Sequence, residues 1–336
     1  MTDIGGMKTV FFFRRANAPW HHSIEELFGT VINALPGRVT PSRYVMKKNS
    51  TGLWNRIYNT IDAAFHQGDV NHITGDVHYI AAFMKKRKTI LTIHDMRILL
   101  SGSRLKVAVI RFFWFIMPSW RVRFITVISE FSKKELIRLT GIPSSKILVV
   151  HDCVSPGIEP APREFNASRP VILNIGTTPN KNLDRVIPAL EGMEITLVII
   201  GKLNQGHEEL LLRHRISYEN YFNLPYEQVL DHYRKSDIIM FASTYEGFGL
   251  PILEANSIGR PVIAGNNSSL PEVAGNAAML VDAGSVDAIR SAVVRLINEP
   301  ELRSRLISNG FENIKRFHPA AIGEQFASLY EQLMKP

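Results

Sequence analysis

Two glutamates flank a glycine-rich turn in the segment Glu246-Gly247-Phe248-Gly249-Leu250, with Glu254 following about one helical turn later. The turn follows the apolar run Ile238–Phe241 and opens a predicted helix, Leu250–Ile258. Glycines let a ligand approach the backbone closely, and a helix start offers free N–H groups that suit a phosphate. Glu254 can reach a polyol such as ribose, and Glu246 can accept from sugar hydroxyls. The alternative is a tight turn with two incidental acids.

A lysine follows another predicted strand. Lys181 ends a loop that contains Gly176, Thr177 and Asn180, directly after the apolar run Val171–Ile175. Because a lysine is a compact point charge that suits phosphate, it could meet a diphosphate there. The alternative is an ordinary surface lysine that precedes a helix.

One histidine stands where chemistry is expected. His94 follows the predicted strand Thr89–Ile93 and precedes Asp95. Histidine is the side chain most readily tuned near neutral pH, although a histidine at a strand end can also simply bond within its own domain. No spacing distinguishes the other histidines that could face a cleft, which are His21, His22, His72 and His78.

The elements that must position these residues alternate along the chain. Short β-branched runs predict buried parallel strands, and the stretches between them predict helices. This alternation indicates a doubly wound α/β fold, which binds ligands at the carboxyl ends of its strands. The length of 336 residues suits two domains, and the proline-rich segment 155–170 is the expected linker.

Several segments together resemble the retaining glycosyltransferase family four, also called glycosyl transferases group 1, whose members have the GT-B fold. The Glu246–Glu254 segment is similar to the paired-glutamate motif of that family. The resemblance covers most of the chain, densely in residues 120–320 and thinly in residues 1–70. The further segments that carry it are Asn174–Leu183, Ser243–Pro251, Ser268–Gly275, Thr92–Asp95 and Val127–Ser132.

The resemblance implies two Rossmann-like doubly wound domains that face a central cleft. Residues 1–157 would form the acceptor-side domain and residues 158–318 the nucleotide-sugar domain. A final helix, 319–336, would cross back to the first domain.

The resemblance also implies roles for individual residues. His94, Lys181 and Glu246 would be catalytic, with Lys181 stabilising the departing diphosphate, which itself takes the acceptor proton. The family usually adds an arginine a few residues before this lysine, whereas Thr177 and Thr178 stand here and the loop is one residue shorter. The implied donor-binding residues are Gly176, Thr177, Asn180, Lys181, Leu224, Glu246, Gly247, Phe248, Gly249, Leu250 and Glu254.

The expected substrate is a GDP-sugar or UDP-sugar that donates a hexose, and the expected hexose is mannose or glucose. The expected acceptor is a cell-surface polysaccharide, such as a lipopolysaccharide, or a lipid-linked glycan. The resemblance implies no metal and no other cofactor, and the sequence has no Cys pair, His-x-x-x-His or Asp-x-Asp. The alternatives are another GT-B enzyme, such as an epimerase or a phosphorylase, and a non-catalytic basic protein that binds nucleic acid or lipid.

Charge is unevenly distributed. Residues 1–160 carry a net +11, whereas the remainder carries −3, within a total of +8. This indicates an anionic partner for the first half, although a merely solvated basic surface is an equal alternative. Lys85–Lys88 and the aromatic stretch Arg111–Arg123 are the candidates for peripheral contact with an anionic membrane. A core helix and a solvated loop are the competing interpretations, and the first is slightly favoured for the aromatic stretch.

The single cysteine, Cys153, excludes an intrachain disulfide and fits a reducing compartment. No signal peptide is recognised at the start, and the longest apolar run, 112–118, is too short to span a bilayer. These features predict a cytoplasmic protein that reaches a membrane only from its surface.

Overall fold

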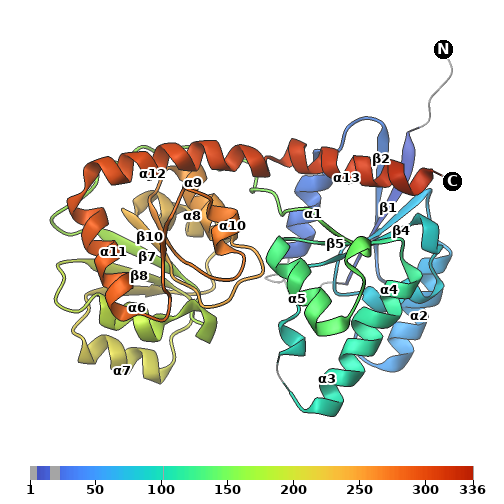
Figure 1. Ribbon diagram of the computed structural model, residues 1–336, viewed down its shortest axis with the longest axis horizontal. Coiled ribbons are helices and arrows are strands. Elements are labelled where there is room, and N and C mark those ends of the chain that lie inside the picture. The colour runs from blue at the N-terminus through green and yellow to red at the C-terminus, as the bar shows by residue number, and fades with distance from the viewer. Residues whose placement is uncertain (1–5, 16–22, 101, 336) are drawn as a thin grey trace. The chain divides into compact units, whose positions relative to one another are not determined.

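The computed structural model describes residues 6–15, 23–100 and 102–335, so His21 and His22 lie outside the described residues. The chain divides into two compact units. Unit 1 comprises Met1–Cys153 and His318–Pro336, and unit 2 comprises Val154–Phe317. Each unit contains a sheet of six parallel strands, with helices packed against it (Figure 1).

The sheet of unit 1 has the strand order β2-β1-β3-β4-β5-β6. Its strands are β1 (Met7–Phe13), β2 (Val39–Val45), β3 (Val70–Ile73), β4 (Thr89–Ile93), β5 (Phe124–Val127) and β6 (Ile147–Val149). Its helices are α1 (Ser23–Asn33), α2 (Leu53–Ala64), α3 (Arg104–Ile110), α4 (Met117–Arg121), α5 (Glu130–Thr140) and α13 (Pro319–Met334). Short 3-10 turns are η1 (His78–Phe83), η2 (Lys86–Lys88), η3 (Arg97–Leu99) and η5 (Ser144–Lys146), and η4 (Arg111–Ile116) is a π-helix that joins α3 to α4.

The sheet of unit 2 has the order β12-β11-β10-β7-β8-β9. Its strands are β7 (Val171–Ile175), β8 (Thr196–Ile200), β9 (Tyr218–Tyr221), β10 (Ile238–Phe241), β11 (Val262–Gly265) and β12 (Met279–Val281). Its helices are α6 (Leu183–Ala189), α7 (Gln205–Arg213), α8 (Tyr226–Lys235), α9 (Leu250–Ile258), α10 (Leu270–Ala274), α11 (Val286–Asn298) and α12 (Pro300–Asn313), with short turns η6 (Pro179–Lys181) and η7 (Ile314–Phe317). Taken from β9, this is the strand order of the Rossmann fold.

The predicted strands and helices are largely confirmed, and several elements were not predicted. Strands β4, β7 and β10 and helix α9 have the predicted bounds. The edge strands β2 and β9 and helices α2 and α7 were missed, because their sequences carry many polar residues. The segment from 155 to 170 has no regular secondary structure.

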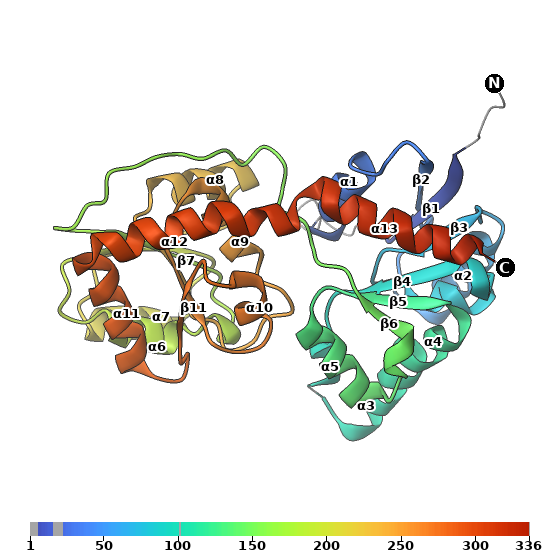
Figure 2. The ribbon, with the colours of Figure 1, turned by 45° about the horizontal axis from the view of Figure 1, so that its top comes forward.

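Helix α13 belongs to the core of unit 1 although it comes last in the sequence. It lies along α1 (Figure 2), and a Cβ added at Gly323 would lie 2.5 Å from the Ala34 carbonyl oxygen. Phe326 and Tyr330 pack with Phe11 of β1 in one buried cluster. Helix α13 therefore covers part of the sheet of unit 1 and completes its core.

His72 of β3 is buried beneath this helix and is part of the core. Its Nδ1 lies 2.7 Å from the Tyr330 hydroxyl, and its Nε2 lies 2.7 Å from Thr92 Oγ1. Burial lowers the pKa of His72 from 6.5 to about 3, with a smaller contribution from His94. The ring is therefore neutral at physiological pH and has a structural role.

Protonation of His72 links the stability of unit 1 to pH. Between pH 6.5 and about 3, the unfolded chain binds a proton that the folded ring rejects. The stabilisation is therefore complete above pH 6.5 and is lost as pH falls. We expect His72→Gln to lower the melting temperature at pH 7.5 but to flatten the dependence of stability on pH between 7 and 5, measured by calorimetry. An unchanged pH slope would contradict this account.

Candidate functional site

The strand order of unit 2 reverses between β7 and β10, which are neighbours in the sheet. The chain continues from β7 to β8 on one side and from β10 to β11 on the other. Ligands of open α/β sheets bind where the carboxyl ends of strands lie beside such a reversal. The loops that follow β7 and β10 carry Lys181 and Glu246, so the fold brings the two predicted residues together.

The loop after β7 is shaped by close packing of Lys181 on Gly176. Gly176 has a φ of 91°, and a Cβ placed there would lie 2.9 Å from Lys181 Cγ. The Asn174 amide donates a hydrogen bond of 3.0 Å to the Gly176 carbonyl oxygen. A side chain at Gly176 would therefore displace the lysine stem, which explains the glycine.

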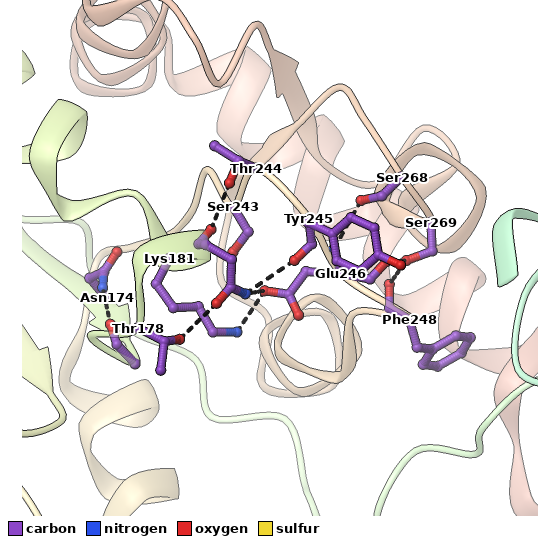
Figure 3. Close-up of polar contacts among 12 residues, drawn as sticks. Asn174, Thr178, Lys181, Ser243, Thr244, Tyr245, Glu246, Phe248, Ser268 and Ser269 are labelled. Atoms are coloured by element: carbon purple, nitrogen blue, oxygen red, sulfur yellow. Dashed lines mark hydrogen bonds and ion pairs between the residues drawn. The ribbon is translucent and has the colours of Figure 1, made fainter. Parts of the chain in front are cut away.

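Lys181 and Glu246 form an ion pair across the two loops. Lys181 Nζ lies 2.7 Å from Glu246 Oε1 and 4.6 Å from the centroid of the Phe241 ring. Asn180 Nδ2 donates to the same carboxylate oxygen and to the Tyr245 carbonyl oxygen, both at 3.1 Å. Figure 3 shows the Lys181 ammonium beside the Glu246 carboxylate. Both charged side chains are largely shielded, with 19% and 16% of their surfaces exposed. The ammonium therefore lies at a fixed place, available to an anionic ligand that replaces the carboxylate.

Asn182 holds the two loops together. Its φ is 66°, in the left-handed region, and its amide donates to the carbonyl oxygens of Ala242 (2.9 Å) and Ala283 (2.7 Å). Asparagine tolerates this conformation better than most residues. The sequence reasoning did not single out Asn182; an asparagine at the junction of a loop and a helix was the available signal.

The glycine-rich turn before α9 is fixed from behind by two serines. Ser269 Oγ donates to the carbonyl oxygens of Glu246 and Phe248, and Ser268 Oγ accepts from the Glu246 backbone N–H at 3.1 Å. Gly249 has a φ of 135°, and a Cβ there would lie 3.0 Å from Leu270 Cδ2. Figure 3 shows Ser268 and Ser269 beside Glu246 and Phe248, and these contacts hold the start of α9 next to Glu246.

Glu254 lies on α9 and is buried, with 9% of its surface exposed. Its Oε1 accepts from the Tyr226 hydroxyl at 2.7 Å and its Oε2 from the Tyr233 hydroxyl at 2.5 Å. Burial raises the pKa of Glu254, and the two tyrosine hydrogen bonds oppose that rise. Each carboxylate oxygen keeps a second lone pair with which it can accept from a ligand hydroxyl. Neither tyrosine was singled out from the sequence.

Comparison with known proteins relates part of the chain to a family. The family model described as glycosyl transferases group 1 matches residues 158–313. An O-antigen chain mannosyltransferase B of Escherichia coli is 31% identical over 222 residues, which are 58% of this chain and 57% of that protein. The segment that carries Lys181, Glu246 and Glu254 therefore matches the glycosyl transferases group 1 family.

The fold of this chain matches solved GT-B structures along almost its whole length. Sucrose-phosphate synthase from Thermosynechococcus elongatus has a TM-score of 0.74 at 14% identity, covering 97% of this chain and 99% of that one. The Anabaena protein HepE in complex with UDP and glucose has a TM-score of 0.72 at 15% identity, with the same coverage. Both units therefore adopt the Rossmann-like domains of the GT-B fold.

The matches to the curated relatives cover only part of the length of each relative. An uncharacterized glycosyltransferase of Methanocaldococcus jannaschii is 24% identical over 160 residues, which are 46% of each chain. The chain thus spans about half the length of the curated relatives that it matches, 57% and 46%.

Two further predicted donor-binding residues, Thr177 and Leu224, lie in loops of unit 2. Thr177 stands in the region where the resemblance implies an arginine. Its hydroxyl donates to the Lys202 carbonyl oxygen at 2.8 Å, and its side chain packs against Gly201. Leu224 lies half-buried between β9 and α8. Thr177 thus joins the loops after β7 and β8 without providing a cation.

His94 belongs to unit 1 and is described with that unit alone. Its Nε2 lies 2.9 Å from the Thr74 carbonyl oxygen, and its Nδ1 lies 3.9 Å from Asp152 Oδ1. Burial raises the pKa of Asp152 to about 6, and the neighbouring His94 and His151 oppose that rise. A carboxylate beside the second ring nitrogen orients the imidazole, so His94 has the geometry of a positioned hydrogen-bonding group.

The described residues contain no group of three or more His, Cys, Asp or Glu side chains that could hold a metal ion. Within the same residues, no helix combines the length and apolar character that a bilayer crossing requires.

The tyrosines of α8 provide a test of how Glu254 is held. Tyr233→Phe removes a fully buried hydroxyl that donates to the carboxylate, so we expect unit 2 to lose about 1.5–3 kcal/mol of stability. Tyr226→Phe is the matched control, because Tyr226 is 41% exposed and water can replace its hydroxyl. Thermal unfolding at neutral pH measures both variants. Equal losses of stability in the two variants would show that burial of the Tyr233 hydroxyl adds nothing to the strength of its hydrogen bond.

Proposed function

We propose that this chain is a retaining glycosyltransferase that moves a hexose, mannose or glucose, from a GDP-sugar or UDP-sugar to a cell-surface polysaccharide or lipid-linked glycan. The observation that carries the proposal is the Lys181–Glu246 pair beside the start of α9, at the strand-order reversal of unit 2. The mannosyltransferase name of one relative and the UDP and glucose in the HepE structure support the substrate class.

In this proposal each group has one task. The diphosphate replaces Glu246 as the partner of Lys181 and lies against the N–H groups of Gly249 and Leu250 at the start of α9. Negative charge on the diphosphate grows as the sugar leaves, so a fixed cation stabilises the transition state more than the bound substrate. The released Glu246 carboxylate then accepts from the sugar hydroxyls.

The remaining predicted residues complete the proposed donor site. Glu254 accepts from the ribose hydroxyls, with Tyr226 and Tyr233 fixing its carboxylate. Leu224 contacts the base, and Gly176, Thr177 and Asn180 shape the phosphate loop, together with Gly247 and Phe248 of the turn. His94 contributes from the acceptor-side domain, near the transferred sugar, and the reaction needs no metal.

The proposed domain roles follow the same division. Residues 1–157 provide the acceptor side, residues 158–318 bind the nucleotide-sugar, and the helix 319–336 completes the first domain. The enzyme would work in the cytoplasm at the inner face of the cell membrane, with peripheral contact with anionic lipid and no nucleic-acid partner.

A panel of GDP, UDP, ADP and their sugars tests the proposed donor class. A nucleotide at about 100 times its dissociation constant should stabilise the protein by about 2.7 kcal/mol in a thermal-shift assay. Glu254→Gln should weaken that nucleotide by about 1.5–3 kcal/mol in calorimetry, because the amide loses the charge that strengthens its hydrogen bonds. Glu227→Gln on α8 is the matched control, since that glutamate pairs with Arg234 instead. No response to any nucleotide would refute the proposal.

Lys181 is tested by kinetics with the donor found in that panel. We expect Lys181→Ala to lower kcat by more than it raises KM, because the cation acts mainly on the departing diphosphate. Lys235→Ala is the control, since Lys235 is exposed and lies before the amino end of β10, away from the carboxyl ends of the strands. An unchanged kcat with a raised KM would make Lys181 a binding residue only. Product analysis by chromatography separates transfer from epimerisation or phosphorolysis.

A further inference from the structure

Unit 1 has an apolar groove that the donor chemistry does not use. Its volume is about 550 Å³, within the range of about 300–1,000 Å³ that small-molecule sites occupy. It is formed by α2, η1, η3 and the continuous helical segment α3–η4–α4. Its walls include Leu53, Ile57, Phe83, Val109 and Phe113.

The polar side chains in the wall already have partners. Arg56 Nε donates to the Ser50 carbonyl oxygen at 2.8 Å, and the Arg56 guanidinium lies 4.4 Å from the Trp114 ring centroid. Thr60 Oγ1 donates to the Arg56 carbonyl oxygen, and the Tyr79 hydroxyl lies 3.0 Å from Ser50 Oγ. A peptide in the groove would bury backbone groups beside mostly apolar surface, which is costly, whereas a hydrocarbon chain carries no such groups.

The aromatic stretch that lines the groove is partly exposed. The favoured sequence interpretation, a core helix, holds for Phe115, which is buried, and is wrong for Phe112, Phe113 and Trp120. Leu53, Phe83 and Phe113 line the groove and are 69%, 58% and 52% exposed. Exposed apolar side chains that gather around a groove indicate a binding surface more than isolated ones do.

The same helical segment is positively charged. Residues 102–129 contain no acidic side chain, and Arg104, Lys106, Arg111 and Arg121 are exposed along them. The preceding stretch, 77–94, also lacks acids and carries the exposed Lys85, Lys86 and Arg87. The charge on the elements that form the groove, and on the stretch that follows η1, therefore complements an anionic head group.

We infer that this groove binds the hydrocarbon chain of a lipid phosphate, with the phosphate on the cations of α3–η4–α4. This rests on the proposed function, because it makes the acceptor a lipid-linked phosphate and assigns its chain a place in unit 1. One chain fills the groove, and the basic segment distinguishes a charged lipid from a neutral one.

The test is binding of decyl phosphate, kept below its critical micelle concentration, to the full chain by isothermal titration calorimetry. We expect saturable binding at one site and a loss of at least tenfold in Val109→Asp, which puts a like charge in the wall. Val294→Asp on α11 of unit 2 is the control, because Val109 and Val294 are similarly exposed, at 48% and 39%. Ala82→Trp, which fills the groove, should act like Val109→Asp, and Ala108→Trp on the exposed side of α3 should not.

Three results would overturn the inference. Equal decyl phosphate affinity in the Val109→Asp and Val294→Asp variants would show that the groove is not the binding site. Binding of inorganic phosphate as tight as that of decyl phosphate would show an anion site without a place for the hydrocarbon chain. Binding to phosphatidylglycerol vesicles without binding to monomeric decyl phosphate would indicate docking on a bilayer instead.

The nucleotide panel on the same variants keeps this test separate from the proposed function. Val109→Asp should retain wild-type nucleotide binding, because the change lies in unit 1 and the donor residues lie in unit 2. Decyl phosphate binding without any nucleotide response would refute the proposed function and keep the lipid site. Nucleotide binding without decyl phosphate binding would refute the lipid site and leave the proposed function standing.

Discussion

The chain leaves β7 and β10 toward opposite ends of the unit 2 sheet, and the candidate site depends on this reversal. Because the two strands are hydrogen-bonded neighbours, their following loops begin side by side yet diverge. Lys181 and Glu246 meet for this reason, although 65 positions separate them in the sequence. Asn182 then fixes the distance between the loops through backbone carbonyl oxygens, so the geometry does not rely on the ion pair alone.

Much of this arrangement could be predicted because local and tertiary preferences agree in it. Strands β7 and β10 are short apolar runs, and α9 follows a glycine turn, so their bounds were predicted correctly. The support of the site could not be predicted in the same way. Tyr233 reaches Glu254 only because α8 packs on α9. From the sequence alone, Tyr233 looks like any other residue on the buried face of an amphipathic helix.

The aromatic stretch 111–123 shows a different limit. Composition states that a segment is apolar, but whether it is covered depends on what packs against it. Phe115 points into the core of unit 1, whereas Phe113, two residues earlier, lies at the open groove. A sequence can therefore locate such a surface without stating which side of the helix is free.

The position of α13 has a consequence for how the molecule is made. Unit 2 is one continuous segment, and the described residues of its hydrophobic cluster around β7 and β8 all belong to that segment. The core of unit 1 instead includes Ile322, Phe326 and Tyr330. During synthesis, domains generally fold as units in the order in which they emerge. The second unit can fold as soon as its own residues leave the ribosome, but the first stays incomplete until residues 319–334 have been translated as well.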